Sequence, residues 1–114
     1  MRAPLLTLLT ALAFAAAAGT PTLAAGKANP NRGKSLYKAS CKSCHGTGGE
    51  GKTLSPLTKT QAQWQKFFKT GAAACAKKAE AKNGKALLPQ DLADMEAYLV
   101  AHAADSDQPE TCGQ

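Results

Sequence analysis

The sequence is poor in the large side chains from which a small protein builds its interior. Aromatic residues make up only 5% of its 114 residues. After residue 25, fourteen large apolar side chains remain, which are Leu36, Tyr37, Leu54, Leu57, Trp64, Phe67, Phe68, Leu87, Leu88, Leu92, Met95, Tyr98, Leu99 and Val100. A short chain is marginally stable even with a full core. We therefore expect disulfides, a metal or a large apolar cofactor to supplement the interior.

The sequence also has no segment in which β-branched apolar residues alternate with polar ones, so strands are not expected. An all-α fold is predicted instead. A first helix should run from residue 30 to about residue 39, because Asn29 can cap it and proline follows at the first helical position. Thr58 or Thr60 can cap a second helix that ends at Gly71. A third helix should run from residue 89 to about residue 104, and residues 72–85 fit either a frayed helix or a loop.

The N-terminal segment has the pattern of a secretory signal. Arg2 precedes an uncharged apolar run over residues 5–18, and small residues lead to Ala24 and Ala25. This order predicts a signal peptide over residues 1–25, cleaved after Ala24 or Ala25. The run is too short and alanine-rich for a membrane span, although an uncleaved anchor is the alternative. We expect one periplasmic domain over residues 26–114, with no membrane insertion after cleavage.

Acidic side chains are scarce in the first two thirds of that domain. Residues 27–85 hold 13 basic side chains but only Glu50 and Glu80, whereas residues 86–114 hold six acids and no Lys or Arg. Export argues against a nucleic-acid partner for the basic stretch. These lysines either only keep the domain soluble or steer it toward an acidic protein partner.

Cys41, Cys44 and His45 form a Cys-x-x-Cys-His motif, which in an exported chain predicts covalent attachment of one c-type haem. Two thiols one helical turn apart can form thioethers with the two vinyl groups on one edge of the porphyrin. The adjacent imidazole then becomes an axial ligand of the iron. The haem would also supply the missing apolar interior. The glycine-rich residues 46–51 would let the backbone approach it closely.

Three other interpretations use the same residues. A thioredoxin-type dithiol would require a βαβ pattern, which the sequence lacks. Structural zinc could use Cys41, Cys44 and His45 with Cys75 or Cys112, but a second closely spaced ligand pair is missing. A plain disulfide between Cys41 and Cys44 would leave His45 and the glycines without a role.

Residues 32–37 (RGKSLY), the Cys-x-x-Cys-His motif and residues 91–99 (DLADMEAYL) resemble the class I cytochromes c. The resemblance covers most of the mature chain. It implies a small fold of three to four helices around a covalently attached haem. The first and last helices should cross, with Gly33 and Tyr98 at the positions where a glycine accepts an aromatic ring, and Tyr37 alongside. It also implies an electron carrier whose haem edge is exposed among lysines.

The family's usual sixth iron ligand is a methionine in the loop before the last helix, and this loop contains no Met or His here. Met95 and His102 are the candidates, but Met95 at helical spacing fits a core position. A histidine near a helix end is also typical of a surface residue. Lys82, Asn83 and Lys85 lie nearest the family's ligand position. The alternative is therefore that the sixth coordination site of the iron is vacant or holds only a weakly bound ligand.

Cys75 and Cys112 are left over, and outside the cytoplasm two such thiols predict a disulfide. The loop that it closes would contain the last helix and would stabilise the fold by roughly 3–4 kcal/mol.

The sequence thus predicts a monomeric, monohaem c-type cytochrome without catalytic activity. It would carry single electrons between redox proteins with acidic docking surfaces. Trp64, Phe67, Tyr98 and Leu99 are expected to line the haem. The alternatives are a haem protein with an open sixth site that binds small ligands, and a zinc or dithiol module.

Overall fold

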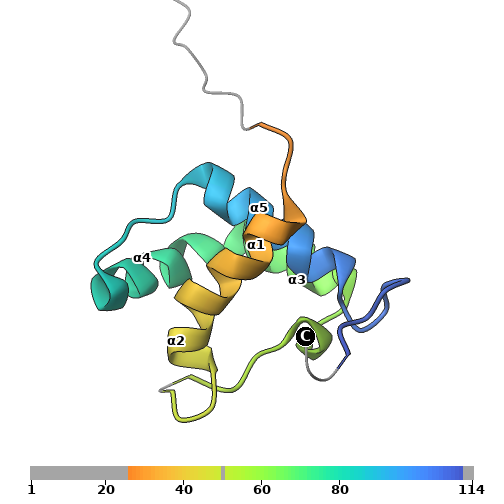
Figure 1. Ribbon diagram of the computed structural model, residues 1–114, viewed down its shortest axis with the longest axis horizontal. Coiled ribbons are helices and arrows are strands. Elements are labelled where there is room, and N and C mark those ends of the chain that lie inside the picture. The colour runs from red at the N-terminus through yellow and green to blue at the C-terminus, as the bar shows by residue number, and fades with distance from the viewer. Residues whose placement is uncertain (1–25, 50, 112–114) are drawn as a thin grey trace, which may run out of the picture.

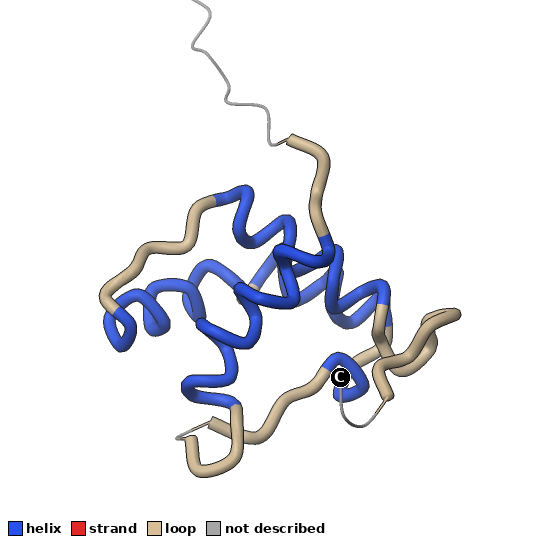
Figure 2. Tube along the Cα trace, in the orientation of Figure 1, coloured by secondary structure: helices blue, strands red, loops and turns tan. Residues whose placement is uncertain are grey.

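The computed structural model describes residues 26–49 and 51–111, and within them the regular elements are all helical (Figures 1 and 2). They are, in chain order, α1 (Pro30–Leu36), the π-helical turn η1 (Tyr37–Cys41), α2 (Lys42–His45), the 3-10 turn η2 (Pro56–Thr58), α3 (Gln61–Thr70), α4 (Ala72–Asn83) and α5 (Pro89–Ala101). The predicted all-α class is confirmed. The predicted signal peptide lies outside the described residues, as does Cys112. None of the helices described is long and apolar enough to cross a membrane.

The first helical run is longer than the sequence indicated. The Asn29 side chain caps α1 as predicted, accepting from the backbone N–H groups of Asn31 and Arg32. Instead of ending near residue 39, the helical backbone continues through η1 and α2 to His45, because neither glycine nor proline interrupts residues 34–45. Gly46 then adopts an extended conformation and ends the run. The motif cysteines therefore lie on a helix, one turn apart.

Two helices follow the glycine-rich loop, α3 and α4. The Thr60 side chain accepts from Gln63 N and caps α3, and Gly71 ends it, as predicted. Residues 72–83, which the sequence left open between helix and loop, form α4. Its run of alanines favours helix. Gly84, at φ +69°, then ends the helix in the left-handed conformation that glycine adopts most easily.

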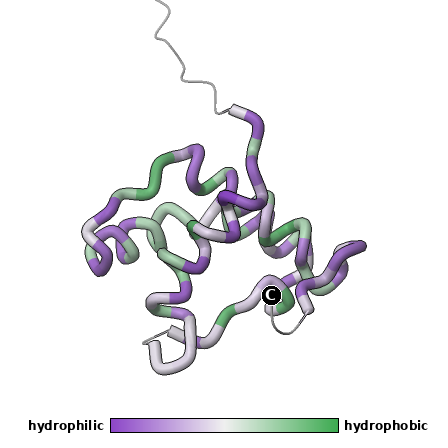
Figure 3. Tube along the Cα trace, viewed as in Figure 1, coloured by the Kyte–Doolittle hydropathy of each residue, from purple (hydrophilic) through white to green (hydrophobic). Residues whose placement is uncertain are grey.

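The last helix, α5, begins at Pro89 as predicted. The Asp91 carboxylate accepts the N–H of Leu88 at 2.9 Å and caps the helix start. The helix ends at Ala101, three residues earlier than predicted, because the following segment folds back. There Glu110 N donates to His102 O at 3.2 Å. Hydrophobic positions recur along α5 and in the connection that leads into it (Figure 3).

Helices α1 and α5 cross in close contact, as the resemblance to cytochrome c predicts (Figure 1). Gly33 faces the backbone of α5 at this crossing. A Cβ on Gly33 would overlap the backbone of Asp94 and Met95, so this glycine allows the two helix backbones to meet directly. Tyr98 packs on Tyr37, with 5.8 Å between the ring centroids. The buried core around them consists of Tyr37, Trp64, Met95, Tyr98, Leu99 and Ala103.

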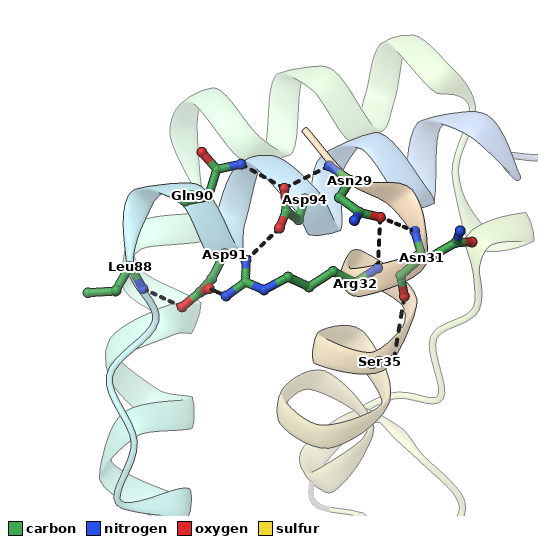
Figure 4. Close-up of polar contacts among 8 residues, drawn as sticks. All are labelled: Asn29, Asn31, Arg32, Ser35, Leu88, Gln90, Asp91 and Asp94. Atoms are coloured by element: carbon green, nitrogen blue, oxygen red, sulfur yellow. Dashed lines mark hydrogen bonds and ion pairs between the residues drawn. The ribbon is translucent and has the colours of Figure 1, made fainter. Parts of the chain in front are cut away.

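Polar side chains also connect α1 to α5 at the edge of this crossing (Figure 4). The guanidinium of Arg32 on α1 pairs with both Asp91 and Asp94 on α5. Asp94 is almost fully buried and also accepts from Asn29 N and from the Gln90 amide, each at 2.8 Å. The Asn29 and Arg32 contacts lower the pKa of Asp94 below its usual value. The ionised carboxylate is therefore the form that the fold prefers.

Candidate cofactor site

The helices line an apolar cavity of about 740 Å³. Its lining comes from the first helical run, the glycine-rich loop, α3, α4 and α5, and includes Tyr37, Cys41, Cys44, His45, Leu54, Trp64, Phe67, Phe68, Ala72, Cys75, Ala79, Leu87, Met95 and Leu99. A cavity of this size is typical of a site for a cofactor or another small molecule. Many of the few large side chains therefore form the wall of this cavity, among them four residues of the buried core, Tyr37, Trp64, Met95 and Leu99. All three residues of the Cys-x-x-Cys-His motif lie on that wall.

A backbone carbonyl orients the imidazole of His45. Its Nδ1 lies 2.9 Å from Lys52 O. Because a carbonyl can only accept, Nδ1 must carry the ring proton, which leaves the lone pair on Nε2 available to a metal. The glycine-rich loop makes this contact possible, since a Cβ on Gly51 would lie 2.5 Å from Nδ1. The ring thus has the tautomer that an iron ligand needs, and the glycine-rich loop holds it in place.

The Cys41 thiol packs toward α5. Burial, with smaller contributions from Cys75 and Cys44, raises the pKa of Cys41 to about 11. Cys41 Sγ also lies 4.0 Å from the sulfur of Met95. One side of the motif therefore packs into the core beside α5.

The two sixth-ligand candidates lie in different places. Met95 lines the cavity, but it is buried in α5 next to Cys41, the predicted point of attachment. His102 is not among the lining residues. Its Nδ1 contacts Gln108 O at 2.8 Å and its ring packs on Tyr98, so its position does not favour iron ligation.

Helix α4 contributes further groups with donor atoms to the cavity wall, namely Cys75, Lys78 and Lys82. The ammonium group of Lys82 donates to Ser43 O at 3.3 Å, and the Asn83 amide contacts the Ser43 hydroxyl at 3.4 Å. These bonds join the end of α4 to Ser43, one of the two residues between the motif cysteines. The predicted Cys75–Cys112 disulfide stays a prediction, because Cys112 is outside the described residues.

Of the four residues predicted to line the haem, Trp64, Phe67 and Leu99 line the cavity, whereas Tyr98 is not among its lining residues. Tyr98 is instead held by the chain that follows α5, where its hydroxyl donates to the Glu110 carboxylate at 2.8 Å. Sequence reasoning also missed Tyr37 as a lining residue and Lys52 O as the partner of His45. A backbone carbonyl leaves no signal in the sequence, although the run of glycines did predict a close approach.

The structure also bears on the alternative interpretations of the motif. In the described part of the chain there is no strand from which a thioredoxin-type βαβ unit could form. Nor do three or more His, Cys, Asp or Glu side chains converge there in a group that could itself hold a metal ion.

A comparison with protein families places these features in context. A family model described as "Cytochrome C oxidase, cbb3-type, subunit III" matches residues 28–99, which is more than half of the chain. This match confirms the predicted resemblance to cytochromes c, and it implies haem c, electron transfer and redox partner proteins. No curated protein and no solved structure matches the chain. The chain belongs to the cytochrome c family that carries this description.

Proposed function

We propose that this protein is an exported, monohaem c-type cytochrome that carries one electron at a time between redox proteins. One observation carries the proposal. Cys41, Cys44 and His45 line the same apolar cavity, and the His45 ring is oriented with Nε2 available. When bound, the haem supplies a one-electron iron couple. The protein itself performs no substrate chemistry.

Each part of the chain has a separate role in this proposal. Cys41 and Cys44 hold the porphyrin edge as thioethers, and His45 is the proximal ligand. Trp64, Phe67 and Leu99 exclude water from the ring, which keeps the local dielectric low around the iron.

Covalent attachment is tested by the pyridine haemochrome spectrum of protein made with a haem-attachment system. We expect one haem per chain bound through two thioethers. Cys41→Ser and Cys44→Ser should each shift the spectrum to that of a single thioether. Cys75→Ser is the matched control, because it changes a cysteine of the same cavity wall and should retain both bonds. Protein without covalent haem would refute the proposal.

The position of Met95 favours a second candidate function, a haem protein with an open or weakly held sixth site. Met95 is the one methionine among the described lining residues, and it lies beside Cys41. Carbon monoxide binding separates the two candidates. A six-coordinate low-spin spectrum that carbon monoxide leaves unchanged supports the electron carrier and refutes the second candidate. Rapid carbon monoxide binding by the ferrous protein supports the second candidate.

The uneven charge distribution supports an acidic docking surface on the redox partner. Thirteen basic side chains lie within residues 27–85, and Lys78 and Lys82 line the cavity itself. Coulomb attraction would then speed the encounter, so the rate of reduction by an acidic donor protein should fall steeply as ionic strength rises. A rate that does not depend on ionic strength would refute electrostatic steering while leaving the haem site intact.

Export and the monomeric state are tested on the same preparation. N-terminal sequencing of the purified mature protein should begin at Ala25 or Gly26. An intact N-terminus starting at Met1 would refute cleavage. Light scattering should give the mass of one chain with one haem.

A further inference from the structure

The four-residue segment 51–54 runs beside the proximal histidine and is hydrogen-bonded to His45 and to the preceding Cys44. Gly51 N donates to Cys44 O at 2.7 Å, and Leu54 N donates to His45 O at 2.9 Å. Between these two bonds, Lys52 O accepts from His45 Nδ1. These contacts fix the segment relative to the motif. They join the segment to the end of the first helical run, and none of them involves a side chain of the buried core.

Tyr37 supplies the bond to the core. Its hydroxyl donates to Leu54 O at 2.6 Å. Its ring is only 2% exposed and packs on Tyr98 between α1 and α5. Among the described residues, Tyr37 is the one side chain besides His45 that hydrogen-bonds to this segment. Burial raises the pKa of Tyr37 to about 12, so the hydroxyl keeps the proton that it donates.

We propose that Tyr37 is a positioning residue for the proximal imidazole, because its hydroxyl holds Leu54 O and thereby the Lys52 carbonyl that accepts the His45 ring proton. This inference rests on the proposed haem site, with His45 as iron ligand. The acceptor of a ligand histidine sets the orientation and basicity of the ring. A more basic imidazole stabilises the oxidised iron and lowers the midpoint potential. Releasing segment 51–54 should therefore weaken the Nδ1–H···O bond and raise the midpoint potential.

The structure offers a matched pair of variants, Tyr37→Phe and Tyr98→Phe. The two tyrosines are equally buried and pack on each other, and each loses one hydroxyl hydrogen bond in its variant. They differ in the segment that the hydroxyl holds. Tyr37 holds the segment beside His45, and Tyr98 holds the Glu110 carboxylate beyond α5.

The experiment uses the holoprotein and three measurements. We expect the His45 Nδ1 proton to exchange with deuterated water a few-fold to about tenfold faster in Tyr37→Phe, the change that loss of one hydrogen bond allows. The midpoint potential should rise in the same variant. Tyr98→Phe should match the wild type in both properties, while urea unfolding shows that both variants lose stability.

Equal shifts in the two variants would show that Tyr37 only stabilises the fold, and would overturn the inference. So would a Tyr37→Phe protein with wild-type proton exchange and potential. If Tyr37→Phe does not fold, the wild-type protein decides, because a Tyr37 hydroxyl proton that exchanges as fast as that of an exposed tyrosine refutes the bond. A wild-type protein without covalent haem would instead refute the proposed function, so the two failures are distinguishable.

Discussion

The contact between α1 and α5 makes Gly33→Ala the sharpest test of the fold. On helix propensity alone, alanine would stabilise α1 by about 1 kcal/mol relative to glycine. The structure reverses this expectation, because the new Cβ would overlap the carbonyl group of Asp94 and the nitrogen of Met95. These are backbone atoms of α5, which cannot rotate aside as a side chain could. The two helices must therefore move apart.

The magnitude follows from what the separation disturbs. Overpacking a well-filled contact costs about 1–3 kcal/mol, and occasionally more. Here it would also loosen the buried rings of Tyr37 and Tyr98, each of which contributes roughly 1.5–3 kcal/mol when fully buried. Allowing for partial relaxation and for the gain in propensity, we expect Gly33→Ala to lower the free energy of unfolding by about 2–4 kcal/mol.

Urea unfolding of the holoprotein, followed by far-ultraviolet circular dichroism, measures this loss. Gly84→Ala is the control. Gly84 has φ +69° and open space around the position of a Cβ, so alanine meets only backbone strain there. Strain of this kind costs about 1–2 kcal/mol. A Gly33→Ala protein as stable as the wild type, or more stable than Gly84→Ala, would refute the close backbone contact between α1 and α5.

Three further predictions concern single side chains. The pKa of Asp94 is lowered from its usual 3.8 in the folded protein. The stability that its ionised carboxylate gives the fold is therefore complete above pH 3.8 and is lost as the pH falls through the folded-state pKa. The wild type should therefore lose more stability than Asp94→Asn over that acidic range, and equal slopes of unfolding free energy against pH would contradict this. Trp64→Phe removes the indole N–H that donates to Pro56 O at 2.9 Å, and the unpaired carbonyl should cost about 1–3 kcal/mol in urea unfolding. Met95→Leu should cost less than about 1.5 kcal/mol and leave the near-infrared charge-transfer band unchanged. Loss of that band would identify Met95 as an iron ligand after all.

The sequence predicted the elements whose signals are local. Thr60 and Gly71 bound α3 as expected, and Pro89 begins α5. The resemblance to cytochromes c also led to the crossing of the first and last helices. In each case the side chain that carries the signal acts within a few residues of its own position. Capping, proline placement and helix-ending glycine are interactions of this kind.

The parts that the sequence did not predict either have no decisive local signal or depend on contacts between distant residues. The first run continues to His45 as a helix although no local residue demands it. Residues 72–83 have good helix formers but no amphipathic pattern, so their helix could not be told from a loop. Arg32 lies between Asp91 and Asp94 only because α1 and α5 cross, and a carbonyl such as Lys52 O has no residue type by which it could be recognised. Periodicity and capping describe neighbours along the chain, and they do not identify these partners.

The scarcity of large side chains explains one further feature of the fold. Three of the five aromatic residues after residue 25 have a polar group at the tip of the ring. Each uses it on a segment outside the α-helices: the hydroxyl of Tyr37 on Leu54, the indole of Trp64 on Pro56 and the hydroxyl of Tyr98 on Glu110. The apolar part of each ring is buried against the core, as is usual for amphipathic aromatics. A chain with so few bulky residues thus uses the same side chain to pack helices and to hold a connecting segment, so changing one of these rings should disturb both.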